Sequence, residues 1–315
     1  MTTPLISIIV PLYNKEKYIL ECLRSIAMQD YLNWECVIVD DGSDDDSPKL
    51  VKDFINSTSG NWILIRKENN GPSSARNFGV LNSTGEFIAF LDSDDIWMPN
   101  KLSRQISDLL SSPLCLASLT DYVITQGNTV GIKGVRSSEH SDLLIRWLNM
   151  RGFGGLVEST GLIRRRVFDA GIYFDETLST GEGLDFMLRI SNLGNFCVVP
   201  DYLTIYRLSE GQLHKNESLV KMNSKKLGEK YASSPKQLNQ ILVDQEKYFA
   251  LSNLRKISRF RLVLTISRHI ARLDLPLMSV AGSIIARNLR AKLISKKTKR
   301  QINAARKRLN RDCYP

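Results

Sequence analysis

Cysteine and histidine are scarce in this sequence, and their scarcity limits the chemistry that the protein can support. The 315 residues include five cysteines and three histidines, and neither a CxxC pair nor a zinc-ligand spacing brings any of them together. A small disulfide-rich scaffold and a structural zinc module are therefore excluded. We expect a cytoplasmic protein with reduced, unpaired cysteines. Because no basic residue precedes the first apolar run, we expect no signal peptide.

The signatures of several common enzyme classes are absent as well. The chain has no G-x-S-x-G elbow, no Walker-type loop and no G-x-G-x-x-G turn. These absences argue against serine hydrolases, P-loop NTPases and dinucleotide oxidoreductases.

Long apolar runs are also lacking in the C-terminal region. Its longest uncharged stretch, Leu275 to Ala286, is about a dozen residues long and contains Pro276 and Gly282. A membrane-spanning helix needs roughly 20 apolar residues. The stretch therefore predicts an interfacial or packed amphipathic segment.

Charge is distributed unevenly along the chain. The whole sequence has 43 basic and 33 acidic residues, for a net charge of +10. Residues 251–315 contain 17 of the basic and 2 of the acidic residues, so the first 250 residues carry a net charge of −5. The asymmetry predicts a polyanionic partner for the basic tail, either a membrane surface or a nucleic acid.

Apolar strand patterns alternate with helical patterns over the first hundred or so residues. Strands are expected from Leu5, at "WECVIVD", from Trp62 to Arg66 and from Phe87 to Leu91. We expect Asn14 to cap the first helix and Pro99 to lie in the first turn of the fourth. The alternation predicts a parallel sheet covered by helices.

The middle of the chain is less regular. Helices are predicted there at 141–150 and from Glu182, and the chain is predicted to be helical from about Lys225.

Polar and acidic residues follow three of these strands. The segments are Pro11–Asn14, Asp40–Ser43 and Asp92–Asp95. Right-handed crossovers place the carboxyl ends of parallel strands at one edge of the sheet, where ligands bind. We therefore expect the three segments to line one cleft.

The acidic triplet is the strongest candidate for a metal site. Asp92, Asp94 and Asp95 offer the oxygen ligands that Mg²⁺ and Mn²⁺ prefer. The alternative is a solvated loop whose aspartates cap the next helix. Four further candidates have similar alternatives. Asp41 either accepts hydrogen bonds from a nucleotide base or ribose or forms part of a turn, and Arg76 either binds an anion or pairs with a nearby aspartate. Glu182 and Asp185 either act as a general base on a hydroxyl or complement the positive end of a helix.

The order of these motifs resembles family 2 glycosyltransferases of the bacterial surface-polysaccharide type, which have the GT-A fold. The resemblance covers roughly Leu5 to Arg207 and is carried by "SIIVPLYNKEKYILECLRSIAMQ", "CVIVDDGSDDDS", "GPSSARNFGVLNSTGEFIAFLDSDDIWMPNKL" and "GEGLDFMLRI". It implies an α/β fold in which helices flank a mixed, mostly parallel sheet, with a basic helical C-terminal extension.

The resemblance also implies an activity and a site. The expected reaction is an inverting transfer of a sugar from a nucleotide-diphosphate sugar, with a UDP-sugar favoured, to a hydroxyl of a lipid-linked glycan. The expected cofactor is Mn²⁺ or Mg²⁺. The implied nucleotide-binding residues are Pro11, Tyr13, Glu16, Asp40, Asp41, Arg76, Asp92 and Ser93, and the implied metal ligands are Asp92, Asp94 and Asp95.

One position departs from the family pattern. The family usually has a Glu-Asp pair at the head of the late helix, with the aspartate as catalytic base, whereas this sequence has Glu182-Gly183. Glu182 is the first substitute for the missing base and Asp185 is the second. The alternative function is a nucleotide-sugar-binding protein with weak or lost catalysis.

The expected organisation has two parts. Residues 1–224 form the GT-A domain, with the nucleotide-sugar half at about 1–110 and the acceptor half at about 111–224. Residues 225–315 form the basic helical region, which we expect to hold the protein peripherally on an anionic membrane, at the inner face of the cell membrane. Nucleic acid is not expected as a partner, because an acidic cleft repels a polyanion that lacks a metal.

Overall fold

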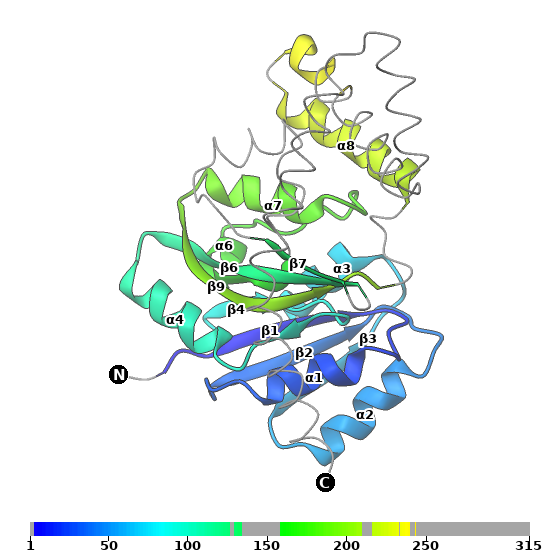
Figure 1. Ribbon diagram of the computed structural model, residues 1–315, viewed down its shortest axis with the longest axis vertical. Helices are drawn as coiled ribbons and strands as arrows, with labels where there is room; N and C mark the ends of the chain where they lie inside the picture. The colour runs from blue at the N-terminus through cyan, green and yellow to red at the C-terminus, as the bar shows by residue number, and fades with distance from the viewer. Residues whose placement is uncertain are drawn as a thin grey trace. The chain divides into compact units, whose positions relative to one another are not determined.

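The structure is a computed structural model that describes residues 3–126, 129–133, 158–209, 216–232, 234–239 and 243 (Figure 1). The chain divides into two compact units, residues 1–227 and 228–315. The helix predicted at 141–150 and the basic region from Leu251 onward lie outside the described residues. Within the described part, no helix is both long and apolar enough to cross a membrane.

Four parallel strands form one half of the sheet. They are β1 (Ile6–Leu12), β2 (Trp34–Asp40), β3 (Asn61–Arg66) and β4 (Phe87–Phe90), in the spatial order β3-β2-β1-β4. Leu12 pairs with Asp40 and Ile9 pairs with Phe90, so the carboxyl ends of β1, β2 and β4 lie at one edge. The parallel arrangement predicted from the alternating strands and helices is therefore confirmed for these four strands.

The second half of the sheet is mixed. β8 (Gly161–Arg164) runs antiparallel to β4 and is followed by β6 (Cys115–Gln126), β9 (Asn195–Arg207) and β5 (Ile96–Trp97). β6 and β9 are parallel, and β7 (Thr129–Lys133) pairs antiparallel with β6. The prediction of a mixed α/β sheet flanked by helices is confirmed.

Helices cover both faces of the parallel half (Figure 1). The described helices are α1 (Ile19–Ala27), α2 (Ser47–Ser57), α3 (Pro72–Leu81), α4 (Lys101–Ser111), α6 (Arg166–Asp169), α7 (Glu182–Ser191) and α8 (Glu217–Tyr231), with a 3₁₀ turn at Glu158–Thr160.

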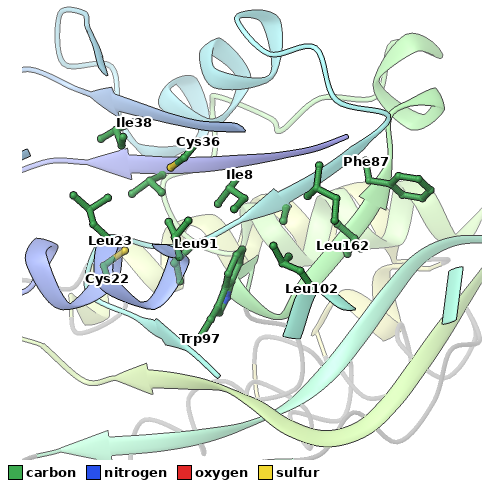
Figure 2. Close-up of a cluster of buried hydrophobic side chains, with 14 of the residues drawn as sticks. Ile8, Cys22, Leu23, Cys36, Ile38, Phe87, Leu91, Trp97, Leu102 and Leu162 are labelled. Atoms are coloured by element: carbon green, nitrogen blue, oxygen red, sulfur yellow. The ribbon is translucent and has the colours of Figure 1, made fainter. Parts of the chain in front are cut away.

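The strand residues alternate between two buried layers, because successive side chains of a strand point to opposite faces. Ile8 and Ile38 belong to one core cluster, together with Cys22 and Leu23 of α1 (Figure 2). On the opposite face, α3 packs so closely on the sheet that a Cβ on Gly79 would lie 2.3 Å from Ile9 Cγ2. Burial on both faces explains why these strands read as continuous apolar runs.

Two predicted helix boundaries are wrong. Asn14 does not cap α1, which begins at Ile19; Asn14 has a φ of 51° and lies in the loop before it. Its side-chain oxygen instead accepts a hydrogen bond from the Asp44 N–H at 2.9 Å. Pro99 precedes α4 rather than lying in its first turn. For Asn14, the contact between loops outweighed the local capping preference.

The expectation that all cysteines are unpaired is also wrong. Cys115 at the start of β6 and Cys197 in β9 form a disulfide, with Cα atoms 5.8 Å apart. The two residues are 82 positions apart in the sequence, and only the pairing of the two strands brings them together. Cys22 and Cys36 are buried free thiols.

The close packing of α3 gives a stability prediction. We expect Gly79→Ala to lower the free energy of unfolding by about 1–3 kcal/mol, because the added methyl group overpacks the layer against Ile9. Gly161→Ala is the control, since its Cβ would have no neighbour closer than 3.7 Å. Urea unfolding curves measure both; an equal effect of the two substitutions would show that the α3 interface is loose.

Candidate active site

The loops after β1 and β2 and the acidic loop after β4 meet at one edge of the sheet. The Asn14 N–H donates to Ser43 Oγ at 3.1 Å, and the Lys15 N–H donates to Ser47 Oγ at 2.8 Å. The Lys15 ammonium lies 2.8 Å from an oxygen of Asp94. The predicted convergence of the three strand ends is therefore confirmed.

Asp41 organises the loop that follows β3. Its two carboxylate oxygens accept hydrogen bonds from the Asn70 N–H (3.1 Å) and the Gly71 N–H (2.8 Å), and one of them lies 2.7 Å from Lys67 Nζ. The side chain is almost completely buried. Oδ2 accepts only the Gly71 N–H among these donors, so it retains acceptor capacity for a ligand.

Asp40 is buried beside it and is less fully partnered. Its Oδ1 accepts a hydrogen bond from the Ser43 N–H at 2.9 Å, which tightens the turn. Its Oδ2 lies 3.4 Å from a nitrogen of Arg66 and has no hydrogen bond, although it is buried. A buried polar atom without a hydrogen bond is costly, so Oδ2 is a ready acceptor.

The remaining residues implied to bind the nucleotide follow β1. Tyr13 is 44% exposed, so its ring is available for stacking. Pro11 is half-buried at the end of β1, and Glu16 is exposed, with one oxygen 3.4 Å from the Asp46 N–H. These side chains border the same edge as Asp40 and Asp41.

The acidic triplet does not form one ligand cluster. Asp92 pairs through Oδ1 with Arg76 at 2.6 Å, whereas Asp94 pairs through Oδ2 with Lys15 and accepts a hydrogen bond from Ser209. Ser93 between them is buried.

Asp95 points into the protein instead. Its oxygens accept hydrogen bonds from Ser159 Oγ at 2.6 Å and from the Arg207 N–H at 3.0 Å, and it is fully buried. Burial, together with the nearby charges of Asp94 and Asp92, raises the pKa of Asp95 well above its ordinary value. Asp95 thus joins the acidic loop to β9 and does not suit a role as metal ligand.

The donor set for a divalent cation is consequently small. Within the described ranges, no group of three or more histidine, cysteine, aspartate or glutamate side chains is arranged to hold a metal. Mg²⁺ commonly binds through one or two carboxylates and takes its other ligands from water and phosphate. Asp92 and Asp94 fit that arrangement, since each has its ion pair through a single oxygen.

Arg76 of α3 is the central cation of the site. Its guanidinium lies 2.6 Å from Asp92 and 3.1 Å from Glu182 of α7, and it stacks over the Phe174 ring at 5.3 Å. Burial opposes its charge, yet nearby carboxylates outweigh burial and raise the pKa of Arg76 above its ordinary value. The carboxylates belong to Asp92, Glu158 and Glu182.

Aromatic packing fixes the position of α7. Phe186 of α7 stacks on Phe174 with ring centroids 4.2 Å apart, and Phe174 meets Phe90 of β4 edge to face at 5.1 Å. The start of α7 is therefore held against the sheet next to Arg76.

Neither of the two predicted catalytic bases is freely presented. Glu182 is paired with Arg76, and its side chain is 12% exposed. Asp185 is paired with Arg189 at 2.8 Å, and its side chain is completely buried. Both carboxylates contribute to holding α7 in place.

A further carboxylate, outside every motif of the sequence, lies beside them. Glu158 begins the 3₁₀ turn before β8, and a Cβ on Gly183 would collide with its carboxyl group. Burial and the charges of Glu182 and Asp92 raise the pKa of Glu158 to about 7, against the lowering effect of Arg76. A cavity of about 20 Å³ adjoins Glu158 and Gly183. Residue 158 follows no recognisable motif, so no sequence signal identified it.

This fold and site define a class of protein. A parallel β3-β2-β1-β4 half joined to a mixed half, with acidic loops at the strand ends, is the GT-A arrangement of nucleotide-sugar transferases. The model for glycosyl transferase family 2 matches residues 7–172, and the chain belongs to that family.

Curated relatives resemble less than half of the chain. The glucosyltransferase WfgD of Escherichia coli, named as a UDP-Glc:alpha-D-GlcNAc-diphosphoundecaprenol beta-1,3-glucosyltransferase, is 39% identical over 127 residues, which are 40% of this chain and 49% of WfgD. The putative teichuronic acid biosynthesis glycosyltransferase TuaG of Bacillus subtilis is 34% identical over 119 residues, which are 38% of this chain and 47% of TuaG. The matches thus span about half the length of these relatives.

Solved structures of S. aureus TarS resemble a larger share of the chain. TarS 1-349 in complex with UDP is 26% identical with a TM-score of 0.53, and the match covers 81% of this chain and 73% of that one. The complex with UDP-GlcNAc is 25% identical with a TM-score of 0.56, covering 75% and 70%.

The central position of Arg76 gives a second prediction. We expect Arg76→Gln to lower the free energy of unfolding by roughly 3–5 kcal/mol, because it leaves buried carboxylates without their counter-charge. Arg104→Gln is the control: it breaks an exposed pair with Asp201, at 2.8 Å, and should cost less than about 1 kcal/mol. Denaturant unfolding measures both. If the two substitutions lower the free energy of unfolding by similar amounts, Arg76 and its carboxylate partners are effectively solvated.

Proposed function

We propose that the protein transfers a sugar, with inversion, from a nucleotide-diphosphate sugar to an acceptor hydroxyl. The observation that carries the proposal is the meeting of the β1, β2 and β4 loops around Asp40, Asp41, Asp92 and Asp94, with Arg76 behind them. Such an edge offers acceptors for a base and ribose and a cationic group near a diphosphate.

The favoured donor is a UDP-sugar. In this proposal Pro11, Tyr13 and Glu16 border the base, and Asp40 and Asp41 accept hydrogen bonds from it or from the ribose. The absence of a hydrogen bond to Asp40 Oδ2 supports this arrangement, as do the complexes of TarS with UDP and UDP-GlcNAc. Asp92 and Ser93 then lie toward the ribose and diphosphate.

A divalent cation, Mn²⁺ or Mg²⁺, is part of the proposal. Asp94 and Asp92 would hold it together with diphosphate oxygens. When bound, the cation neutralises charge on the diphosphate and makes it a better leaving group. Arg76 remains beside Asp92 and orients its carboxylate.

The proposed acceptor is a hydroxyl of a lipid-linked glycan in bacterial surface polysaccharide synthesis, in keeping with the names of WfgD and TuaG. We also propose residues 1–224 as the catalytic domain and 225–315 as a region that binds an anionic membrane at its cytoplasmic face. Each nearby lysine or arginine adds about 1 kcal/mol to such binding.

A second candidate function is binding of the nucleotide sugar without efficient turnover. Gly183 favours it, because α7 has no carboxylate at that position. Donor hydrolysis by the purified chain separates the two functions, since a binding protein shifts its melting temperature with the donor but releases no nucleotide.

Donor binding is the first test. We expect UDP-glucose or UDP-GlcNAc with Mn²⁺ to raise the melting temperature, whereas GDP-mannose does not. A ligand present at about 100 times its Kd adds about 2.7 kcal/mol to stability. Asp94→Asn should remove the part of the shift that depends on Mn²⁺, and Asp53→Asn, on the exposed side of α2, should keep it. The proposal fails if no UDP compound shifts the wild-type chain.

Membrane binding is a separate test. Substituting Lys296, Lys297, Lys299 and Arg300 by glutamine in the full chain should reduce binding to vesicles that contain phosphatidylglycerol by more than about tenfold. Lys49→Gln with Lys52→Gln, two exposed positions of α2, is the control and should bind as the wild type does. Equal sedimentation of all three proteins with the vesicles would remove the membrane role of the tail.

A further inference from the structure

Glu158 occupies the space in which a side chain of residue 183 would lie. A Cβ built on Gly183 would be 1.7 Å from Glu158 Oε1 and 2.6 Å from its carboxyl carbon. Both distances are far below van der Waals contact. The carboxyl group of Glu158 and a side chain at position 183 are therefore alternatives in space, and glycine is required at 183 as long as Glu158 keeps this place.

The backbone next to Glu158 is firmly anchored. The Ser159 hydroxyl accepts a hydrogen bond from the Asp92 N–H at 3.1 Å and donates one to Asp95 at 2.6 Å. The Ser159 carbonyl accepts hydrogen bonds from Trp97 Nε1 at 2.7 Å and from Thr204 Oγ1 at 3.1 Å. A reactive group needs such a rigid support to hold its geometry.

The surroundings of Glu158 differ from those of the two carboxylates on α7. Glu158 is half-buried, whereas Asp185 is completely buried against Arg189. Glu182 is hydrogen-bonded to Arg76. The small cavity bordered by Glu158 and Gly183 lies on the same side of α7 as Phe174 and Phe186, which also line it.

We propose that Glu158 is the catalytic base of the transfer and supplies the carboxylate that α7 lacks at position 183. The inference rests on the proposed function. The acceptor O–H bond breaks, and its proton moves to the Glu158 carboxylate. The acceptor oxygen forms a bond to the anomeric carbon, and the bond from that carbon to the diphosphate oxygen breaks, so that the electron pair leaves with the nucleoside diphosphate.

Reciprocal substitution at the two positions tests the inference. The variants are Glu158→Gln, Glu158→Ala, Gly183→Asp and the double variant Glu158→Ala/Gly183→Asp, with Glu86→Gln, an exposed glutamate, as the matched control. The assay measures nucleotide release from UDP-GlcNAc and UDP-glucose, with water as acceptor. Melting temperatures with and without UDP report folding and donor binding for each variant.

We expect Glu158→Gln and Glu158→Ala to lower kcat at least about a hundredfold, because a general base contributes 10²–10⁴ to the rate. Their UDP-induced melting shifts should be those of the wild type. Gly183→Asp alone should also be impaired, because its side chain collides with Glu158. In the double variant the aspartate has room, and kcat should recover at least about tenfold over Glu158→Ala.

Two results would overturn the inference. One is a kcat of Glu158→Gln within about fivefold of the wild type, and the other is a double variant that folds and binds UDP but is no faster than Glu158→Ala. A merely structural role for Glu158 would alter melting temperature or KM and leave kcat unchanged. Failure of the proposed function looks different, since the wild-type chain would then neither bind UDP nor release nucleotide from either donor.

Discussion

The buried guanidinium of Arg76 is the interaction on which the site depends. It extends from α3, which packs on the sheet through Gly79, to Asp92 after β4 and to Glu182 at the start of α7. Asp92 is 16 residues from Arg76 in the sequence, whereas Glu182 is 106 residues away. One cation links them because each carboxylate would be costly to bury without a counter-charge. The position of the acidic loop after β4 and the position of α7 are therefore coupled through Arg76.

Asp41 and Asp94 also have charge partners within the protein. Lys67 and two backbone N–H groups satisfy Asp41, and Lys15 is paired with Asp94. A ligand or cation that binds to these carboxylates competes with partners already present. In the proposed function, the groups that replace these partners are a divalent cation and a diphosphate, which would have to interact more strongly with the carboxylates than an ammonium or an amide does.

Aromatic side chains provide the apolar support behind these charges. Phe90 of β4, Phe174 and Phe186 of α7 form a continuous contact between the sheet and the helix. The same rings line the small cavity beside Glu158, and burial is the largest cause that raises the pKa of Glu158 to about 7. Packing and electrostatics at this site are thus not independent: a change in the ring contacts alters the environment of the carboxylates.

The sequence by itself determined the parallel half of the sheet and the edge at which its polar loops meet. Both follow from local properties, namely the apolar runs of β1, β2 and β4, the alternating helices and the handedness of the crossovers. Only the tertiary structure decided the partners: it turned Asp95 inward toward Arg207, joined Cys115 to Cys197, and placed Glu158 against Gly183. These contacts join segments that are distant in the sequence, and the packing of β8, β9 and α7, which no local pattern specifies, brings them within reach.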